Sequence, residues 1–193
     1  MKESILLIVL IFVTFVFFFL NKNEVIYMKS EYDNQEYLVR NGDNKREAAN
    51  LLSQLTDRLF KLKDFLEYNI SKYPKYKNHI QRLCKNLDKN RTKIYETEIN
   101  SDQTSYSVNK GEELVFCLRS KQTKEMHPIN LLMYVGIHEI SHVACPEIGH
   151  TPLFKDIFSF FTQIAIQINI YNYHDYATDP VEYCGMILNS SII

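Results

Sequence analysis

The segment PINLLMYVGIHEISHVACP, at positions 128–146, carries the strongest structural signal in this chain. Proline suits the first turn of a helix, and the residues after it are mostly apolar. The helix would end at Cys145-Pro146, because a proline disfavours helical backbone in the residue before it. The segment therefore predicts a helix over residues 128–144. Apolar residues on both sides of its polar positions indicate that this helix is buried.

Two histidines share one face of this predicted helix. His138 and His142 are four residues apart in the pattern H-E-x-x-H, so their side chains lie about one turn apart. Two imidazoles at this spacing can bind one Zn²⁺, and Glu139 can reach a water on the metal. The pattern predicts a metal-dependent hydrolase with Glu139 as its general base.

A catalytic zinc needs a third protein ligand and one open position. His150 follows Gly149, which would let the chain turn back toward the helix. We therefore predict that His138, His142 and His150 together hold one Zn²⁺ per chain. The other candidates for the third ligand are Cys145, Glu147, Asp156, His174 and Glu182.

The C-terminal segment supplies two further candidate site residues. Tyr183 and His174 fall in this segment and are candidates to contact the substrate or to stabilise negative charge in the transition state. A packing role is the alternative for Tyr183. We interpret the other two histidines, His79 and His127, as surface or helix-cap residues.

Hydrophobic periodicity predicts the elements around the motif. A period of 3.6 predicts helices over residues 45–70 and 75–89, broken at Pro74, and a last helix from Thr151, its N-cap, to about residue 171. Alternating patterns predict strands at residues 25–29, 37–40, 92–99, 104–108 and 113–119, with a hairpin turn at 109–111. The predicted fold class is α+β, with a small antiparallel sheet and its hairpin packed against the motif helix and further helices. If strand 114–119 lies at a sheet edge, an extended peptide could pair with it.

Length and composition are those of one folded domain with an appendage. The chain has 193 residues, of which 46% are hydrophobic and 23% charged, with five glycines and five prolines. Its net charge of −1 argues against a dedicated nucleic-acid binder, so no nucleic-acid partner is expected.

The N-terminus contains an uninterrupted apolar run. Residues 5–20 read ILLIVLIFVTFVFFFL, and as a helix they would span about 24 Å of the roughly 30 Å hydrocarbon core. No small residues follow the run, which favours an uncleaved anchor over a cleaved signal peptide. We therefore predict a transmembrane helix within residues 1–22, a lipid bilayer as partner and a single-pass membrane location of unassigned side. Residues 23–193 form the second predicted domain, with a helical part over 43–90 and a catalytic core over 92–193.

The four cysteines are far apart in the chain. Cys84, Cys117, Cys145 and Cys184 include no C-x-x-C pair, which excludes a zinc ribbon. One or two disulfides are expected in an oxidising compartment and buried thiols in the cytosol.

The sequence resembles the zincin metallopeptidases and is most similar to their small WLM and SprT-like branch. In that branch H-E-x-x-H precedes a histidine with an aromatic residue shortly after it, as in GHTPLF at residues 149–154 here. The similarity is motif-level and covers roughly residues 114–161. It implies a zincin-like fold, zinc ligands at His138, His142 and His150, and a general base at Glu139. The branch includes proteases that act on proteins crosslinked to DNA, but this chain differs by its N-terminal apolar run and its lack of a basic tail.

Together these features predict a membrane-anchored zinc metallopeptidase that acts on a peptide or protein substrate. The alternative is a non-catalytic, metal-stabilised membrane protein that serves as a scaffold. A metal hydrolase that acts on another kind of bond is a third reading of the same motif.

Overall fold

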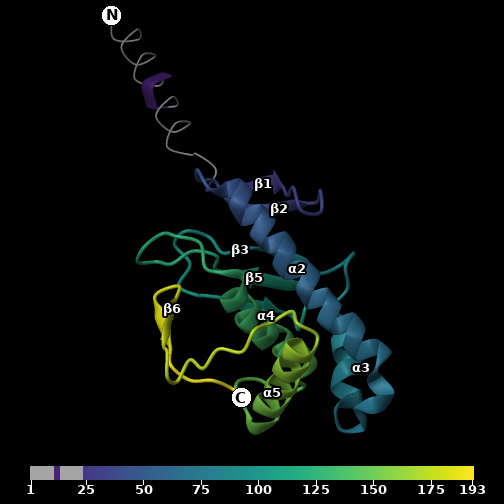
Figure 1. Cartoon of the computed structure of the whole chain (residues 1–193). Helices are drawn as coiled ribbons and strands as arrows, with labels where there is room; N and C mark the ends of the chain where they lie inside the picture. The colour runs from purple at the N-terminus through teal and green to yellow at the C-terminus, as the bar shows by residue number, and fades with distance from the viewer. Residues whose placement is uncertain (1–10, 14–23) are drawn as a thin grey trace, which may run out of the picture.

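The structure, a computed structural model, describes residues 11–13 and 24–193. It is a mixed α/β fold in which one buried helix, α4 (Ile129–Ala144), lies among other helices and a small sheet. Figure 1 shows α2 running past the sheet toward α3, with α5 beside α4 near the C-terminus. The apolar side chains of these elements form a common core.

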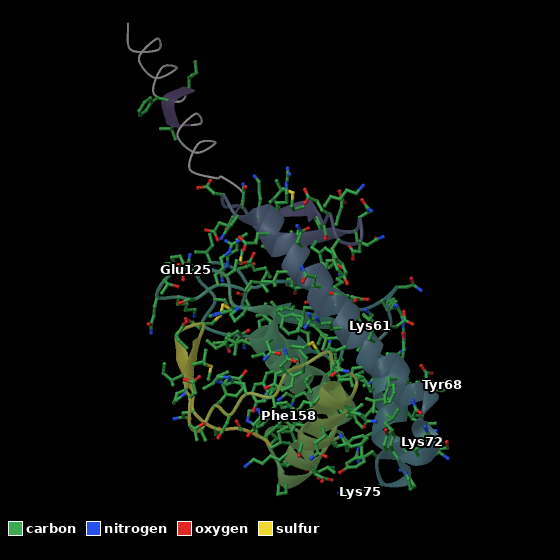
Figure 2. The ribbon with its side chains drawn as sticks, in the orientation of Figure 1. Lys61, Tyr68, Lys72, Lys75, Glu125 and Phe158 are labelled. Atoms are coloured by element: carbon green, nitrogen blue, oxygen red, sulfur yellow. A yellow bond between two sulfur atoms is a disulfide. The ribbon has the colours of Figure 1, made fainter. Side chains whose placement is uncertain are left out.

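Three helices surround α4. They are α2 (Lys45–Tyr68), α3 (Lys77–Asn86) and α5 (Pro152–Gln167). Each contacts α4, and Figure 2 shows side chains filling the space between α4 and α5, Phe158 among them. Two short 3-10 turns, Ile70–Lys72 and Pro74–Tyr76, separate α2 from α3. The helices predicted after residue 44 are thus present. α3 begins two residues later than predicted because the chain around Pro74 forms these turns, and it ends at Asn86 instead of residue 89.

A glycine lets α2 approach α4 closely. A Cβ at Gly136 would lie 3.1 Å from side-chain atoms of both Leu55 and Leu59 of α2. Gly136 is two residues before His138, so this contact fixes that part of α4 against α2. A helix packed in this way cannot shift easily, because protein interiors are close-packed.

Within the described part of the chain, the strands form three small sheets. The hairpin of β1 (Val25–Lys29) and β2 (Glu36–Arg40) is one, and that of β6 (Val181–Tyr183) and β7 (Met186–Leu188) is another. The central sheet has the order β3-β5-β4, with β3 at Lys93–Glu96, β4 at Tyr106–Val108 and β5 at Glu113–Phe116. The turn between β4 and β5 has positive φ at Asn109, Lys110 and Gly111, as the hairpin prediction requires.

The prediction that the small sheet is antiparallel is wrong for one pair of strands. β4 pairs antiparallel with β5, but β3 pairs parallel with it, Lys93 opposite Glu113. β5 is therefore the central strand, so the strand predicted over residues 114–119 does not lie at a sheet edge; the edge strands are β3 and β4. Strand order depends on contacts between distant segments, so alternation along one strand cannot reveal it.

The structure contradicts the prediction of an N-terminal transmembrane helix. Across residues 11–13 and 24–193, no helix combines the length and the apolar character needed to cross a membrane. Most of the run at residues 5–20, which carried that prediction, lies outside the described residues. The membrane location and the lipid partner inferred from the run are therefore not supported.

Candidate metal centre

Three imidazole nitrogens converge at the C-terminal end of α4. The Nε2 atoms of His138 and His142 are 3.2 Å apart, those of His142 and His150 are 3.2 Å apart, and those of His150 and His138 are 3.0 Å apart. Three neutral rings cannot satisfy one another in this triangle, because every contact is between Nε2 atoms and a given Nε2 either donates or accepts but cannot do both. A cation at the centre of the triangle could bind all three, so these histidines form a group that could hold a metal ion.

The local sequence explains how the third histidine reaches the first two. Helix α4 ends at Ala144, and the chain reverses through a short exposed loop in which Gly149 has φ +82°. Helix α5 then begins at Pro152, and the Thr151 hydroxyl accepts a hydrogen bond of 3.2 Å from the N–H of Phe154. This N-cap fixes the direction of α5 immediately after His150.

Phe154 packs under all three imidazoles. Its ring stacks on that of His142, with centroids 4.1 Å apart and an interplanar angle of 22°. It also lies 5.0 Å from the ring centroids of His138 and His150. Because Phe154 is buried, it excludes water from this side of the cluster and restrains the ring orientations.

The two helical histidines are held in the neutral form. Burial lowers the pKa of His138 to about 3, with a further contribution from the neighbouring His142 and His150. Burial also lowers the pKa of His142 to about 4, aided by His150 and by the ammonium of Lys110. A neutral imidazole is the form that binds a metal, so the protein presents these side chains ready for coordination.

Glu139 is a buried carboxyl group beside the histidines. Its side chain is 5% exposed, and desolvation raises its pKa to about 8. It lines the same cavity as the three histidines. A carboxyl group with a raised pKa beside an open cavity is a feature of acid–base sites.

The cavity over the histidines has a volume of about 640 Å³. This is within the range of sites that bind small molecules or peptide side chains. One wall is the segment around the edge strand β4, residues 104–107, with Asn109 and Lys110. The other walls include the apolar side chains Tyr134, Val135, Ile148, Met186 and Leu188.

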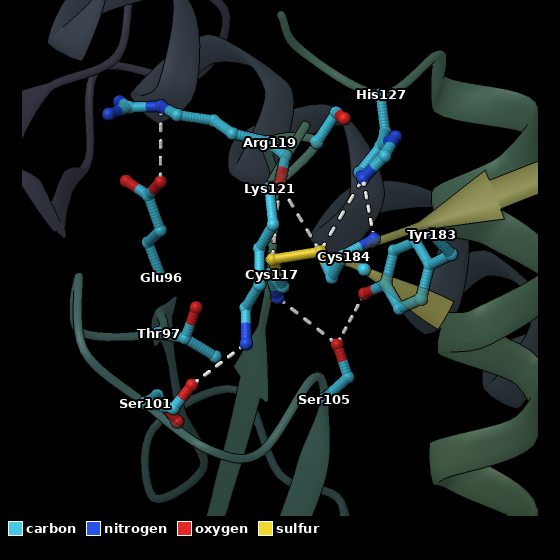
Figure 3. The surroundings of a disulfide bond; sticks show 12 residues. Glu96, Thr97, Ser101, Ser105, Cys117, Arg119, Lys121, His127, Tyr183 and Cys184 are labelled. Atoms are coloured by element: carbon cyan, nitrogen blue, oxygen red, sulfur yellow. Dashed lines mark hydrogen bonds and ion pairs between the residues drawn. A yellow bond between two sulfur atoms is a disulfide. The ribbon is translucent and has the colours of Figure 1, made fainter. Parts of the chain in front are cut away.

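Tyr183 lies at this cavity and is fixed from several sides. Its hydroxyl is 2.5 Å from the Ser105 hydroxyl, and the Ser105 hydroxyl accepts a hydrogen bond of 3.1 Å from the N–H of Cys117 (Figure 3). Burial raises the pKa of Tyr183, with a further contribution from the charge of Glu139, and both residues line the cavity. A disulfide between Cys117 and Cys184 ties β5 to the residue after Tyr183.

His127 supports the same corner and is not a surface residue. It is buried, and its Nε2 accepts a hydrogen bond of 3.2 Å from the N–H of Cys184. Desolvation lowers the pKa of His127, which keeps the ring neutral and leaves Nε2 free to accept. The prediction of a surface or cap role was wrong because the contact partner lies 57 residues away.

The other candidate ligands lie elsewhere. His174 contacts the carbonyl oxygen of Asp179 at 2.9 Å and does not line the cavity. Asp156 pairs with Lys75 on the exposed side of α5, and the Glu182 carboxylate accepts from the N–H of Gly185. Cys145 is a buried free thiol. Neither it nor Glu147 is among the residues that could hold the ion.

Two residues at the site were not identified from the sequence. Ser105 holds the Tyr183 hydroxyl, and the Lys110 ammonium donates to the backbone around the histidine cluster. The sequence indicates only a turn at Lys110, and it contains no pattern that points to a role for Ser105. Both residues contact segments that are distant in sequence.

Comparison with known proteins finds viral relatives. The chain is 43% identical over 187 residues to uncharacterized protein R325 of Acanthamoeba polyphaga mimivirus, covering 95% of this chain and 94% of the relative. Uncharacterized protein 136R of Invertebrate iridescent virus 6 is 31% identical over 85 residues, or 43% of this chain and 47% of the relative. Uncharacterized protein 042R of Invertebrate iridescent virus 3 is 37% identical over 75 residues, or 39% and 46%. No protein-family model and no solved structure matches the chain.

Proposed function

This chain belongs to the family of the mimivirus protein R325, and we propose that it is a zinc-dependent metallopeptidase. The observation that carries the proposal is the triangle of Nε2 atoms beside a buried glutamate. His138, His142 and His150 supply three ligands, the cavity leaves room for a fourth position, and Glu139 faces the same space. Three protein ligands with an open position are typical of catalytic rather than structural zinc.

The spacing of the ligand atoms fits zinc. Two nitrogens that are each about 2.05 Å from a tetrahedral zinc ion lie about 3.3 Å apart. The three Nε2–Nε2 distances of 3.0–3.2 Å are within a few tenths of an ångström of that value. An all-imidazole ligand set also favours zinc over magnesium or calcium, which prefer oxygen ligands.

Glu139 is placed to move a proton. Bound zinc would polarise a substrate carbonyl and lower the pKa of a water molecule toward about 7. The Glu139 carboxylate would accept a proton from the attacking water and return it to the leaving amine. Its raised pKa of about 8 reflects desolvation alone, and a neighbouring cation would lower that pKa toward the working range.

Tyr183 is suited to stabilise negative charge on the substrate. Its raised pKa keeps the hydroxyl protonated, so the hydroxyl can donate a hydrogen bond. Ser105 holds that hydroxyl at the cavity in the resting arrangement. His174, the second residue predicted for such a role, is bound to Asp179 instead and is not part of the proposal.

The proposed substrate is an extended peptide or protein segment. β4 is one of the two edge strands of the central sheet, and within the described residues only β5 pairs with it. A peptide could add to this edge as a further strand and cross the histidine cluster. The apolar walls of the cavity would then accept an apolar side chain next to the cleaved bond.

The proposal is tested with the purified full chain and three variants. Wild type should bind about one zinc ion per chain by elemental analysis and cleave peptides in a mixed library. His150→Ala should lose zinc, whereas His174→Ala, the matched control outside the cluster, should retain it. Glu139→Gln should retain zinc and lose hydrolysis by roughly 10²–10⁴-fold, the usual contribution of a general base. A wild-type protein without zinc affinity would refute the proposal.

The second candidate function is a non-catalytic protein that the metal only stabilises. It predicts that Glu139→Gln leaves every measurable function intact while His142→Ala unfolds the domain. The buried, desolvated Glu139 argues for the enzyme, because an unpaired carboxyl group at this position lowers the stability of the fold without serving a structural site.

A further inference from the structure

Lys110 lies outside the predicted site, yet its ammonium contacts the backbone that carries the metal cluster. Residues 109–111 form the tight turn between β4 and β5, and Lys110 itself has φ +57°. This turn directs the lysine side chain toward the C-terminal end of α4. The Nζ atom donates to the carbonyl oxygens of His142 at 3.1 Å, Cys145 at 3.0 Å and Glu147 at 2.9 Å.

These three contacts use the full donor capacity of the group. An ammonium has three N–H donors and no acceptor, and here each donor has one carbonyl partner. The group is therefore already satisfied and is not left to bind a substrate carboxylate. Its role must be sought in the segments that it joins.

The carbonyl of His142 needs such a donor because of the local sequence. In a continuing helix it would accept from the N–H four residues later, but that residue is Pro146, which has none. The carbonyls of Cys145 and Glu147 lie past the helix end, where backbone acceptors also lack helical partners. A cation at this end is favoured in addition by the helix dipole.

The loop at residues 146–150, which carries the proposed third ligand, makes few packing contacts with the rest of the fold. Residues 146–150 are all exposed, the Ile148 side chain is 90% exposed, and a Cβ at Gly149 would meet nothing within 4 Å. Loop conformations cost entropy to restrict, and few packing contacts are available here to offset that cost. The hydrogen bonds from Lys110 are thus the main attachment between this loop and the end of α4.

We propose that Lys110 is the positioning residue for the third metal ligand. By joining the His142 carbonyl to those of Cys145 and Glu147, its ammonium holds the loop so that the His150 Nε2 faces the pair on α4. The proposal rests on the proposed metal site, but its mechanical part, the restraint of the loop, exists without metal.

The sign of the effect on metal binding separates this role from simple electrostatics. The Lys110 charge is close to His142, so by Coulomb repulsion alone its removal would strengthen the binding of a cation. Loss of the three hydrogen bonds would instead free the loop and weaken binding. The two explanations predict opposite changes for the same neutral substitution.

The test compares Lys110→Met with Lys124→Met in the full chain. Lys124 is a matched control, because it also has positive φ, at +66°, and also donates to a backbone carbonyl, that of Lys121, away from the cluster. Zinc affinity is measured by competition with a chelator, and the visible spectrum of bound Co²⁺ reports the number of nitrogen ligands. Lys110→Met should weaken zinc binding by roughly 10- to 100-fold, as for other residues that orient metal ligands, and Lys124→Met should not.

A second measurement does not depend on metal. Amide hydrogen exchange of residues 147–150 in the metal-free protein should accelerate in Lys110→Met and stay unchanged in Lys124→Met. Unchanged exchange, or zinc binding as tight as or tighter than that of wild type, would overturn the proposal. If wild type binds no zinc, the peptidase proposal fails, and the exchange measurement still decides whether Lys110 restrains the loop.

Lys110→Arg serves if the methionine variant does not fold. It keeps the positive charge, but a planar guanidinium cannot direct donors at three converging carbonyls as an ammonium does. Weaker zinc binding and faster loop exchange than in wild type would support the proposal. Wild-type behaviour of Lys110→Arg in both measurements would show that an ammonium directed at the three carbonyls is not needed to hold the loop and would overturn the proposal.

Discussion

Reduction of the disulfide between Cys117 and Cys184 should destabilise the domain strongly. The two cysteines are 67 residues apart in sequence, and the loop-entropy relation for that length gives about 4.4 kcal/mol at 25 °C. With a urea m-value of about 2 kcal/mol/M, the unfolding midpoint should fall by about 2 M. Both cysteines are buried, so an alanine pair is the cleanest genetic equivalent of the reduced protein.

Urea unfolding followed by circular dichroism measures this effect. Wild type is compared with and without a dithiol reductant, and Cys117→Ala/Cys184→Ala is treated in the same way. The double variant should match reduced wild type and should not respond to reductant. Cys84→Ala is the matched control, because Cys84 is a free, half-buried thiol, and it should leave the response to reductant intact.

One result would refute the reasoning about the disulfide. If reduction is verified by mass spectrometry and the midpoint moves by less than about 0.5 M, the chain-entropy account fails for this loop. If reduction instead abolishes hydrolysis and leaves the urea midpoint unchanged, the bond serves mainly to hold Tyr183, the residue before Cys184, at the cavity.

Three further predictions concern packing, charge and metal. Gly136→Ala should lower stability by about 1–3 kcal/mol in urea unfolding, because the new methyl group would press on two leucines of α2. Glu96→Gln should lower the free energy of unfolding by about 3–5 kcal/mol, because Glu96 is buried within 3.2 Å of the Arg119 Nε and its loss leaves that charge unpaired. Glu98→Gln, at an exposed position, is the control, and equal effects of the two substitutions would contradict the explanation. Removal of zinc by a chelator should lower the thermal unfolding midpoint of wild type and not that of His142→Ala, because a ligand at 100 times its Kd stabilises the folded state by about 2.7 kcal/mol. Equal shifts of the two midpoints in calorimetry would contradict a zinc site at these histidines.

Features governed by neighbours in sequence were predictable from the sequence. Helix α4, its end before Pro146 and the turn at residues 109–111 follow from periodicity and backbone preferences. Thr151 was identified as an N-cap for the same reason, and its hydroxyl does accept from the N–H of Phe154. The pairing of His138 with His142 is fixed by helical geometry, so its spacing was known before any tertiary contact.

Features that depend on contacts between distant segments were decided only by the tertiary structure. The parallel pairing of β3 with β5 and the choice of Cys184 as partner for Cys117 need distances that no local pattern contains. The same holds for the place of Tyr183 at the cavity and the exclusion of His174 from it.

The histidine cluster combines both kinds of information. The sequence alone determined that His138 and His142 lie together, because positions four apart on a helix must share a face. The third position, His150, was a candidate among several until the chain was folded, because a loop after a helix can turn in many directions. The tertiary structure selects one of these directions through contacts from other elements, chiefly the Lys110 ammonium from the β4–β5 turn and the Phe154 ring from α5.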